Sequence, residues 1–371
     1  MNIGVDIRPL MTPVRTGVGE YTYELLNALF EIDRKNQYFL FYNSYKNIDK
    51  YLPIWKYDNV RFVANRWPNK IFNFCQKFLN WPKIDKLLLK NLDYFFSPNF
   101  NFTALGKDVK KILTVHDLSY EFFPEYFSFK QKLWHWLISP KKQCLSANII
   151  LAPSVNTKRD LVNFYQIPEN KIKVLYPGLS SVFKDTPEQN KKLELPDNYI
   201  LFLGSLEPRK NILGIIESYE TAFNSLPLPY NLVIAGAPGW KNKEIFARIE
   251  KSPLKQKINS IGYVKNEDKS ELYRRASLFV FPSFYEGFGF PVLEAMFSRI
   301  PVITSNRSSL PEITESFAWL IDPNKPAQIS AGLTTVLNNE KLRNEIITKA
   351  KEKSLTFSWE KAAKEFLEIL K

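Results

Sequence analysis

The feature that most constrains the fold is the alternation of short apolar runs with longer amphipathic stretches along the whole chain. Continuous apolar runs are typical of strands buried on both faces, and the stretches between them are long enough for crossover helices. The pattern therefore predicts an α/β protein with parallel sheets. The expected strands are Asn2–Ile7, Tyr38–Tyr42, Arg61–Ala64, Asp93–Phe96, Ile112–Val115, Ile149–Ala152, Ile172–Leu175, Tyr199–Leu203, Asn231–Ala235, Ile258–Ile261, Leu278–Phe281, Val302–Thr304 and Ala318–Ile321.

The expected strands fall into two groups, separated by the polar, proline-containing segment 180–196. A chain of 371 residues is long enough for two domains that each bury a core. We expect two Rossmann-like domains, residues 1–180 and 181–356, and a C-terminal helix, residues 357–371, that packs back on the first domain. The carboxyl ends of the strands, where such sheets bind ligands, would then face a central cleft.

Residues 281–296 carry the densest functional signal, because an apolar strand leads through a glycine-containing loop into an expected helix with Pro291 at its first position. A helix start offers unpaired N–H groups and the positive end of the helix dipole, so it binds anions such as a pyrophosphate. Two carboxylates, Glu286 and Glu294, flank that start and are suited to bind hydroxyls. The combination predicts a nucleotide-sugar site. A solvated Glu294 beside an ordinary glycine turn is the simpler alternative.

Four further features stand where predicted strands end. They are the loop with Gly17 and Gly19, the single residue His116, the basic pair Arg209 and Lys210 after Gly204, and the segment with Val264 and Asn266. Adjacent cations at such an edge are suited to clamp a diphosphate, Arg as a fork and Lys as a point charge. The last segment is placed to contact a nucleobase. Ordinary turns, a structural histidine and a solvated basic pair are the alternatives.

Several functional classes are disfavoured by the composition. The two cysteines, Cys75 and Cys144, lack motif spacing, which argues against a disulfide framework or a thiolate metal site. The sequence contains no Asp-x-Asp pair, so we expect no metal and no cofactor. Neither a spanning apolar run nor a cleaved leader is apparent, which predicts a cytoplasmic protein.

Positive charge is concentrated in the first half, where residues 1–180 hold 25 Lys and Arg against 15 Asp and Glu. Segments 66–83 and 128–142 mix these cations with aromatic side chains, including Trp67, Phe72 and Trp81. Such segments are suited to the anionic inner surface of a membrane. Core packing of the aromatic residues is the alternative. We expect no nucleic-acid partner, because no nucleic-acid-binding motif is present.

Taken together, the motifs resemble glycosyltransferase family 4, whose members have the GT-B fold. The resemblance covers nearly the whole chain and rests on Thr-Gly-Val-Gly-Glu-Tyr, Val-His-Asp-Leu, Gly-Ser-Leu-Glu-Pro-Arg-Lys-Asn, Gly-Tyr-Val and Phe-Tyr-Glu-Gly-Phe-Gly-Phe-Pro-Val-Leu-Glu-Ala-Met. It implies transfer of a sugar from a nucleotide-sugar with retention of the anomeric configuration. The N-terminal motif is similar to that of polysaccharide and lipopolysaccharide mannosyltransferases, which implies GDP-mannose as donor and a glycan or lipid-linked acceptor.

The resemblance also implies a role for each motif. Arg209 and Lys210 would hold the diphosphate, Glu294 the ribose and Glu286 the donor sugar. Gly17 would lie beside the phosphates, and His116 would flank the reacting carbon. The backbone of Phe288–Val292, with Gly287, Gly289, Phe290 and Pro291 in the same loop, would contact sugar and phosphate.

Three alternatives remain open at this point. A UDP-sugar donor is one, because Asn266 stands near the position where an acidic residue often reads guanine in GDP-using relatives. A nucleotide-sugar epimerase is another, although it requires additional carboxylates and a histidine in the cleft for proton transfer, and the chain has only His116 and His135. A membrane-bound scaffold without catalysis is the third, and the complete set of motifs argues against it.

Overall fold

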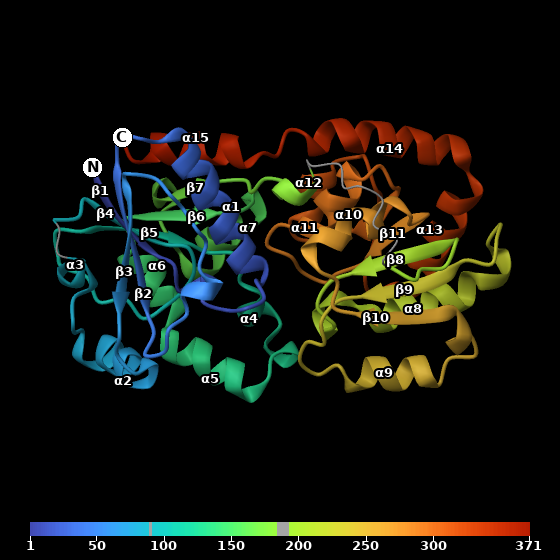
Figure 1. The fold of residues 1–371 in the computed structure, drawn as a ribbon. Coiled ribbons are helices and arrows are strands. Elements are labelled where there is room, and N and C mark those ends of the chain that lie inside the picture. The colour runs from blue at the N-terminus through green and yellow to red at the C-terminus, as the bar shows by residue number, and fades with distance from the viewer. Residues whose placement is uncertain (89–90, 184–192) are drawn as a thin grey trace. The chain divides into compact units, whose positions relative to one another are not determined.

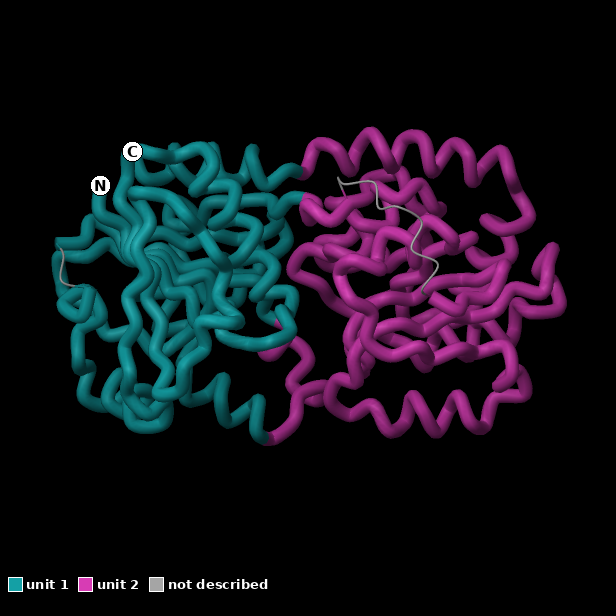
Figure 2. The backbone as a smooth tube through the Cα atoms, viewed as in Figure 1, with its two compact units in different colours: residues 1–118, 130–178, 358–371 teal, residues 119–129, 179–357 magenta. Residues whose placement is uncertain are grey.

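The computed structural model describes residues 1–88, 91–183 and 193–371. The chain divides into two compact units (Figure 2), one of residues 1–118, 130–178 and 358–371 and one of residues 119–129 and 179–357. We call them unit 1 and unit 2. Part of the predicted linker, residues 184–192, lies outside the described residues.

Unit 1 contains a seven-stranded parallel sheet (Figure 1) with the order β3-β2-β1-β4-β5-β6-β7. Its strands are β1 Asn2–Asp6, β2 Gln37–Asn43, β3 Val60–Asn65, β4 Tyr94–Ser97, β5 Lys110–Thr114, β6 Ile149–Ala152 and β7 Ile172–Val174. Its helices include α1 Gly17–Ile32, α2 Asn69–Phe74, the π-helical η3 Cys75–Leu79, α3 Ile84–Leu87, α5 Phe129–Ile138, α6 Pro140–Ser146, α7 Val155–Tyr165 and α15 Trp359–Ile369. Phe129, the first residue of α5, belongs to unit 2.

Unit 2 contains a six-stranded parallel sheet with the order β10-β9-β8-β11-β12-β13. Its strands are β8 Tyr199–Leu203, β9 Asn231–Ala235, β10 Ile258–Gly262, β11 Leu278–Phe281, β12 Val302–Ser305 and β13 Trp319–Ile321. Its helices include α4 Ser119–Phe122, η4 Pro124–Tyr126, η7 Pro208–Lys210, α8 Ile212–Ala222, α9 Lys243–Glu250, α10 Asn266–Arg274, α11 Phe290–Phe297, α12 Leu310–Thr314, α13 Pro326–Asn338 and α14 Glu340–Ser354.

The thirteen predicted strands are confirmed, each within a few residues of its expected bounds. Their sequences explain why. All residues of β8 and β11 are buried, and these strands read Tyr-Ile-Leu-Phe-Leu and Leu-Phe-Val-Phe. Parallel strands with helices on both faces require such continuous apolar runs. The predicted two Rossmann-like domains are therefore present.

The strand order places a switch point in the middle of each sheet. In unit 2 the chain leaves β8 toward one edge through β9 and β10, then returns to β11 and proceeds toward the other edge. Unit 1 has the same switch between β1 and β4. The loops that follow two such neighbouring strands diverge and leave a crevice for a ligand. The loops after β8 and β11 are therefore the first place to look for a site.

The domain boundaries differ from the expectation in one place. Residues 119–129 were expected within the first domain, but they belong to unit 2. The reason is aromatic packing, since Phe122 and Phe123 contact Tyr285 and Phe127 stacks on Trp240. Residues 358–371 belong to unit 1, where α15 packs on α1.

The two aromatic basic segments of unit 1 divide between core and surface. Phe72 is fully buried among Phe41, Ile84 and Phe95, and Trp67 packs against that cluster. Core packing, the alternative, is therefore confirmed for Phe72, and Trp67 is partly buried against the same cluster. Four neighbouring side chains of α2, η3 and the following turn are exposed, namely Phe74, Phe78, Leu79 and Trp81. No helix of the described residues has the length and apolarity to cross a bilayer.

Candidate active site

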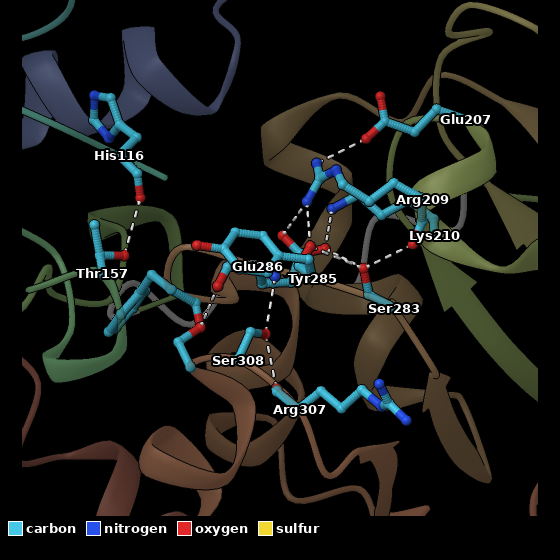
Figure 3. Close-up of polar contacts among 12 residues, drawn as sticks. His116, Thr157, Glu207, Arg209, Lys210, Ser283, Tyr285, Glu286, Arg307 and Ser308 are labelled. Carbon is cyan, nitrogen blue, oxygen red and sulfur yellow. Dashed lines mark hydrogen bonds and ion pairs between the residues drawn. The ribbon is translucent and has the colours of Figure 1, made fainter. Parts of the chain in front are cut away.

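The switch point of unit 2 brings the predicted cations and the first predicted carboxylate together (Figure 3). Glu286, in the loop after β11, is 7% exposed. Its Oε1 lies 2.5 Å from Nζ of Lys210, and its Oε2 lies 3.1 Å from Nη1 of Arg209. Ser283 donates a hydrogen bond of 2.6 Å to the same Oε1. The carboxylate is thus fixed by two cations and a hydroxyl.

Arg209 ties the loops after β8 and β11 to each other. Its Nη2 donates to Oε1 of the buried Glu207 at 2.7 Å, and its Nη1 donates to the carbonyl of Tyr285 at 2.5 Å. Its own carbonyl accepts from the amide of Phe284 at 2.9 Å. Two cations and two carboxylates therefore balance in charge, and an incoming diphosphate would share both cations with Glu286.

Burial and charge act in opposite directions on these groups. Burial alone would raise the pKa of Glu286, but Arg209 and Lys210 outweigh it and hold that pKa at about 2. Burial lowers the pKa of Lys210, and the neighbouring carboxylate of Glu286 opposes that shift. Glu286 is consequently ionised throughout the physiological range.

The start of α11 lies at the end of the same loop. Gly289 caps the helix with a φ of 110°, and a Cβ on it would come within 2.7 Å of Leu310. A glycine is therefore required here by both backbone conformation and space. Pro291 stands at the second helical position, one residue later than expected.

The backbone donors of this loop are fewer than the sequence suggested. Pro291 has no N–H, and the amide of Val292 donates to the carbonyl of Gly289 at 3.0 Å. Val292 is also fully buried in the core. The ligand contact by the Val292 backbone stays a prediction, its amide being engaged within the first helical turn, and the amides of Phe288 and Gly289 are further candidate donors.

Glu294 lies one turn into α11 and is 7% exposed. Tyr273 of α10 donates a hydrogen bond of 2.9 Å to its Oε2, and Nζ of Lys269 lies 3.8 Å from its Oε1. The same hydroxyl lies 3.2 Å from the carbonyl of Pro291. Helix α10 therefore fixes this second carboxylate, which is well suited to accept hydrogen bonds from a diol.

The predicted nucleobase segment joins β10 to α10. Gly262 ends the strand with a φ of 71°, Val264 is buried and Asn266 begins the helix. At the end of β8, a Cβ on Gly204 would lie 3.3 Å from the ring of Phe202, and the carbonyl of Gly204 lies where a Cβ on Gly236 would fall. The close approach of the chain after β8 to the chain after β9 therefore requires a glycine at position 236.

In unit 1, His116 lies two residues beyond β5 and is partly buried. Its Nε2 lies 2.8 Å from the carbonyl of Pro98, and its ring meets that of Tyr21 edge-on at 4.8 Å. Because a carbonyl only accepts, Nε2 carries the proton and Nδ1 of the neutral ring is the acceptor. Burial lowers the pKa of His116, opposed by the Pro98 contact and Asp117.

The two predicted glycines of unit 1 have different environments. Gly17 begins α1, and a Cβ on it would meet no atom within 4 Å. Gly19 is buried, and a Cβ there would lie 3.2 Å from the carbonyl of Pro9. Packing therefore explains Gly19, whereas open space at a helix start surrounds Gly17.

Five polar residues of the site were missed by sequence reasoning: Glu207, Lys269, Tyr273, Ser283 and Ser308. Ser308 accepts a hydrogen bond from the amide of Glu286 at 2.9 Å. Glu207 and Ser283 could have been found from the sequence, because each follows the end of a predicted strand. The sequence around Tyr273 and Ser308 contains no motif that would have indicated them. Within the described ranges, no three His, Cys, Asp or Glu side chains gather as a metal-ligand group.

Comparison with known proteins agrees with this geometry. Residues 15–181 match the family described as Glycosyltransferase Family 4, and residues 184–353 match Glycosyl transferases group 1. The chain is a GT-B glycosyltransferase, and it belongs to glycosyltransferase family 4. Over 97% of both chains it is 27% identical to the O-antigen chain mannosyltransferase B of Escherichia coli.

Solved structures share the fold at lower identity. The sucrose-phosphate synthase of Thermosynechococcus elongatus superposes with a TM-score of 0.75 at 18% identity, over 99% of this chain and 98% of that one. Anabaena Alr3699/HepE in complex with UDP-glucose superposes with a TM-score of 0.72 at 16% identity, over 100% and 99%. These likenesses support the GT-B fold.

Proposed function

We propose that this enzyme transfers a hexose, with mannose from GDP-mannose as the first candidate, to a lipid-linked or polysaccharide acceptor with retention of configuration. One observation carries the proposal. A buried carboxylate and two cations meet at the switch point of unit 2, and a second buried carboxylate lies one turn into the helix that follows. Near full-length similarity to an O-antigen mannosyltransferase supports the sugar and the acceptor class.

Each group of the site has a role in this proposal. Arg209 and Lys210 stabilise the charge that develops on the leaving diphosphate, as pre-organised cations do in a buried site. Glu286 binds hydroxyls of the donor sugar and Glu294 binds those of the ribose. Gly17 lets the acceptor-side backbone approach the phosphates, and His116 lies beside the reacting carbon.

The reaction needs little covalent participation by the protein. The acceptor hydroxyl attacks the anomeric carbon from the face of the leaving group, and its proton passes to a phosphate oxygen. The carbon–oxygen bond to the diphosphate breaks as the new glycosidic bond forms. We propose that Arg209 and Lys210 supply the positive charge, so that no divalent metal is required.

A UDP-sugar is the alternative donor. It is favoured by Asn266, because α10 begins with an amide where a carboxylate would pair with guanine. The test is a panel of nucleotide-sugars incubated with purified protein and a lipid-linked acceptor, followed by release of the nucleoside diphosphate. We expect acceptor-dependent turnover of GDP-mannose. Turnover of a UDP-sugar alone would reassign the donor, and failure with every donor would overturn the proposed function.

We also propose that unit 1 attaches to the anionic inner surface of a membrane. The supporting observation is the exposed group Phe74, Phe78, Leu79 and Trp81, which we call the aromatic patch. Lys77, which lies between Phe74 and Phe78 in the sequence, donates a hydrogen bond to Ser139 at the end of α5. Helix α5 carries the exposed Trp136, which extends the same surface. Aromatic rings at headgroup depth and cations toward anionic lipid are typical of interfacial segments.

Vesicle sedimentation tests this attachment. We expect binding to phosphatidylglycerol vesicles that weakens with salt and with Phe78→Ala and Trp81→Ala together. Tyr45→Ala, at an exposed aromatic residue elsewhere in unit 1, is the matched control and should bind like the wild type. The attachment would be contradicted if the protein did not bind the vesicles, or if binding were the same at high salt and in the double variant.

A further inference from the structure

Residues 119–129 form a short segment that we call the strap. It contains α4 and η4, and it packs within unit 2 although its neighbours in sequence on both sides belong to unit 1. Only Asp117 and Leu118 separate it from His116. The strap therefore connects the proposed catalytic histidine directly to a set of contacts on unit 2.

One end of the strap is anchored by the loop after β9. Nε1 of Trp240 donates to the carbonyl of Tyr126 at 2.5 Å, and Nζ of Lys241 donates to the carbonyl of Glu125. The indole also stacks on Phe127, with ring centres 5.6 Å apart and planes at 25°. Trp240 thus contributes both a hydrogen bond and a ring stack to the same segment.

The rest of the strap covers the residues that precede Glu286. Phe122 and Phe123 lie 5.7 and 5.9 Å from the ring of Tyr285, and Tyr126 lies 5.8 Å from that of Phe284. Tyr285 is 7% exposed. Aromatic pairs of this kind stabilise a structure beyond the area they bury, so the strap holds this loop through several such contacts.

Tyr285 joins the strap to the ion cluster. Its ring faces Phe122 and Phe123, whereas its carbonyl accepts from Nη1 of Arg209 at 2.5 Å. Ser283 donates to the same carbonyl at 3.3 Å. The next residue in sequence is Glu286. A shift of the Tyr285 ring therefore moves the backbone from which the carboxylate of Glu286 projects.

We propose that Trp240 is a positioning residue for the transfer reaction. It holds the strap against Tyr285 and thereby keeps the carboxylate of Glu286 in contact with Arg209 and Lys210. The proposal rests on the role assigned to Glu286 above. Trp240 acts through the strap, because its hydrogen bond goes to Tyr126 and its ring stacks on Phe127. Its loss should lower kcat more than the affinity for free nucleotide, since the nucleotide half of the donor is bound by α11 and Glu294.

The test uses the full chain and compares Trp240→Ala and Trp240→Phe with the wild type. The second variant keeps an aromatic ring for Phe127 and removes the N–H donor. We expect Trp240→Ala to lower kcat on the order of tenfold to a hundredfold, as small misplacements of catalytic groups do. Trp240→Phe should recover part of that loss, and nucleoside diphosphate affinity should change less than about twofold. Phe246→Ala, at a half-exposed ring on α9, is the control and should match the wild type.

A double variant separates positioning from general damage. If Trp240 acts through Glu286, then Trp240→Ala should change kcat less than about twofold in a Glu286→Gln background. Hydrogen exchange over residues 283–288 should also be faster in Trp240→Ala, with exchange in α13 unchanged. Unaltered kcat in Trp240→Ala, unaltered exchange over 283–288, or a full additional loss in the Glu286→Gln background would overturn the proposal. Failure of the proposed function has a different signature, because the wild type itself would then be inactive or Glu286→Gln would retain full kcat.

Discussion

Glu286 and Glu294 are both buried carboxylates on one loop and helix, but their partners differ in kind. Among the residues that the structure describes, Glu286 is paired with Arg209 and Lys210, whereas Glu294 accepts a hydrogen bond from the neutral hydroxyl of Tyr273 and lies 3.8 Å from Lys269. A carboxylate held by cations competes with an incoming diphosphate, and one held by a hydroxyl remains a good acceptor for a diol. The two residues should therefore respond differently to the same substitution.

The first prediction concerns that pair. Glu294→Gln should weaken binding of the free nucleoside diphosphate and of the nucleotide-sugar by similar amounts. The expected loss of binding free energy is about 1–3 kcal/mol, that of a charge-assisted hydrogen bond. Glu286→Gln should bind free nucleotide at least as tightly as the wild type, because Arg209 and Lys210 no longer share a carboxylate. Its kcat should fall on the order of a hundredfold. Titration calorimetry and steady-state kinetics measure both. Weak nucleotide binding by Glu286→Gln beside normal binding by Glu294→Gln would reverse the assignment.

The second prediction concerns His116 and pH. Because its folded pKa is lowered below 6.5, the fold favours the neutral ring. Stability from this residue is therefore complete above pH 6.5 and declines as the pH falls below it, where the unfolded chain gains a proton. His116→Gln cannot gain that proton. Urea unfolding at pH 8 and at pH 5.5 measures the free energy of unfolding. Between these two pH values the wild type should lose more of that free energy than His116→Gln, and an equal loss in both proteins would contradict the lowered pKa.

Residue identity predicted the main groups of the site but not their partners. Strand ends are visible in the sequence, so His116, Arg209, Lys210 and Glu286 could be located from it. The ion pairs of Glu286 required the register of two loops that lie 76 residues apart in the chain. Tyr273 and Ser308 come from segments without a local signal, and only tertiary packing brings them to the carboxylates.

At the level of elements, the sequence predicted the positions of strands better than it predicted what the helices pack against. Strands of a doubly wound sheet are buried on both faces, so a continuous apolar run marks them. An aromatic residue in a helix carries no such mark, because it is equally compatible with core and surface. The sequence left Phe72 open between surface and core, and it lies in the core; the strap was expected in the first domain and belongs to unit 2.

Helix α15 gives the third prediction. Ser358 caps it by accepting from the amide of Lys361 at 3.1 Å, and Phe366 packs against Phe96 of β4 with ring centres 5.0 Å apart. Phe366 is 1% exposed. Phe366→Ala should destabilise unit 1 by about 3–5 kcal/mol through the cavity it leaves. Thermal unfolding measures the loss, and Lys364→Ala, on the exposed side of α15, should be nearly neutral. If both variants had the melting temperature of the wild type, α15 would not contribute to the core of unit 1.

At the level of the whole molecule, the balance of charge leads to the fourth prediction. The proposed clamp supplies two buried cations where a divalent metal would otherwise stabilise the leaving diphosphate. Transfer should therefore proceed at the same rate in EDTA as in Mg²⁺ or Mn²⁺. A rate abolished by EDTA and restored by either metal would contradict the clamp as the source of that charge.

The most direct test of the central claim is the kcat for sugar transfer by Lys210→Gln, measured with the preferred donor and acceptor. Lys210 is buried against Glu286, and its charge is proposed to act on the leaving group. We predict that kcat falls on the order of a hundredfold or more, while Lys255→Gln, at a half-exposed cation of the same unit, retains wild-type kcat. Wild-type kcat in a folded Lys210→Gln variant would show that the cluster at the switch point of unit 2 does not carry the transfer.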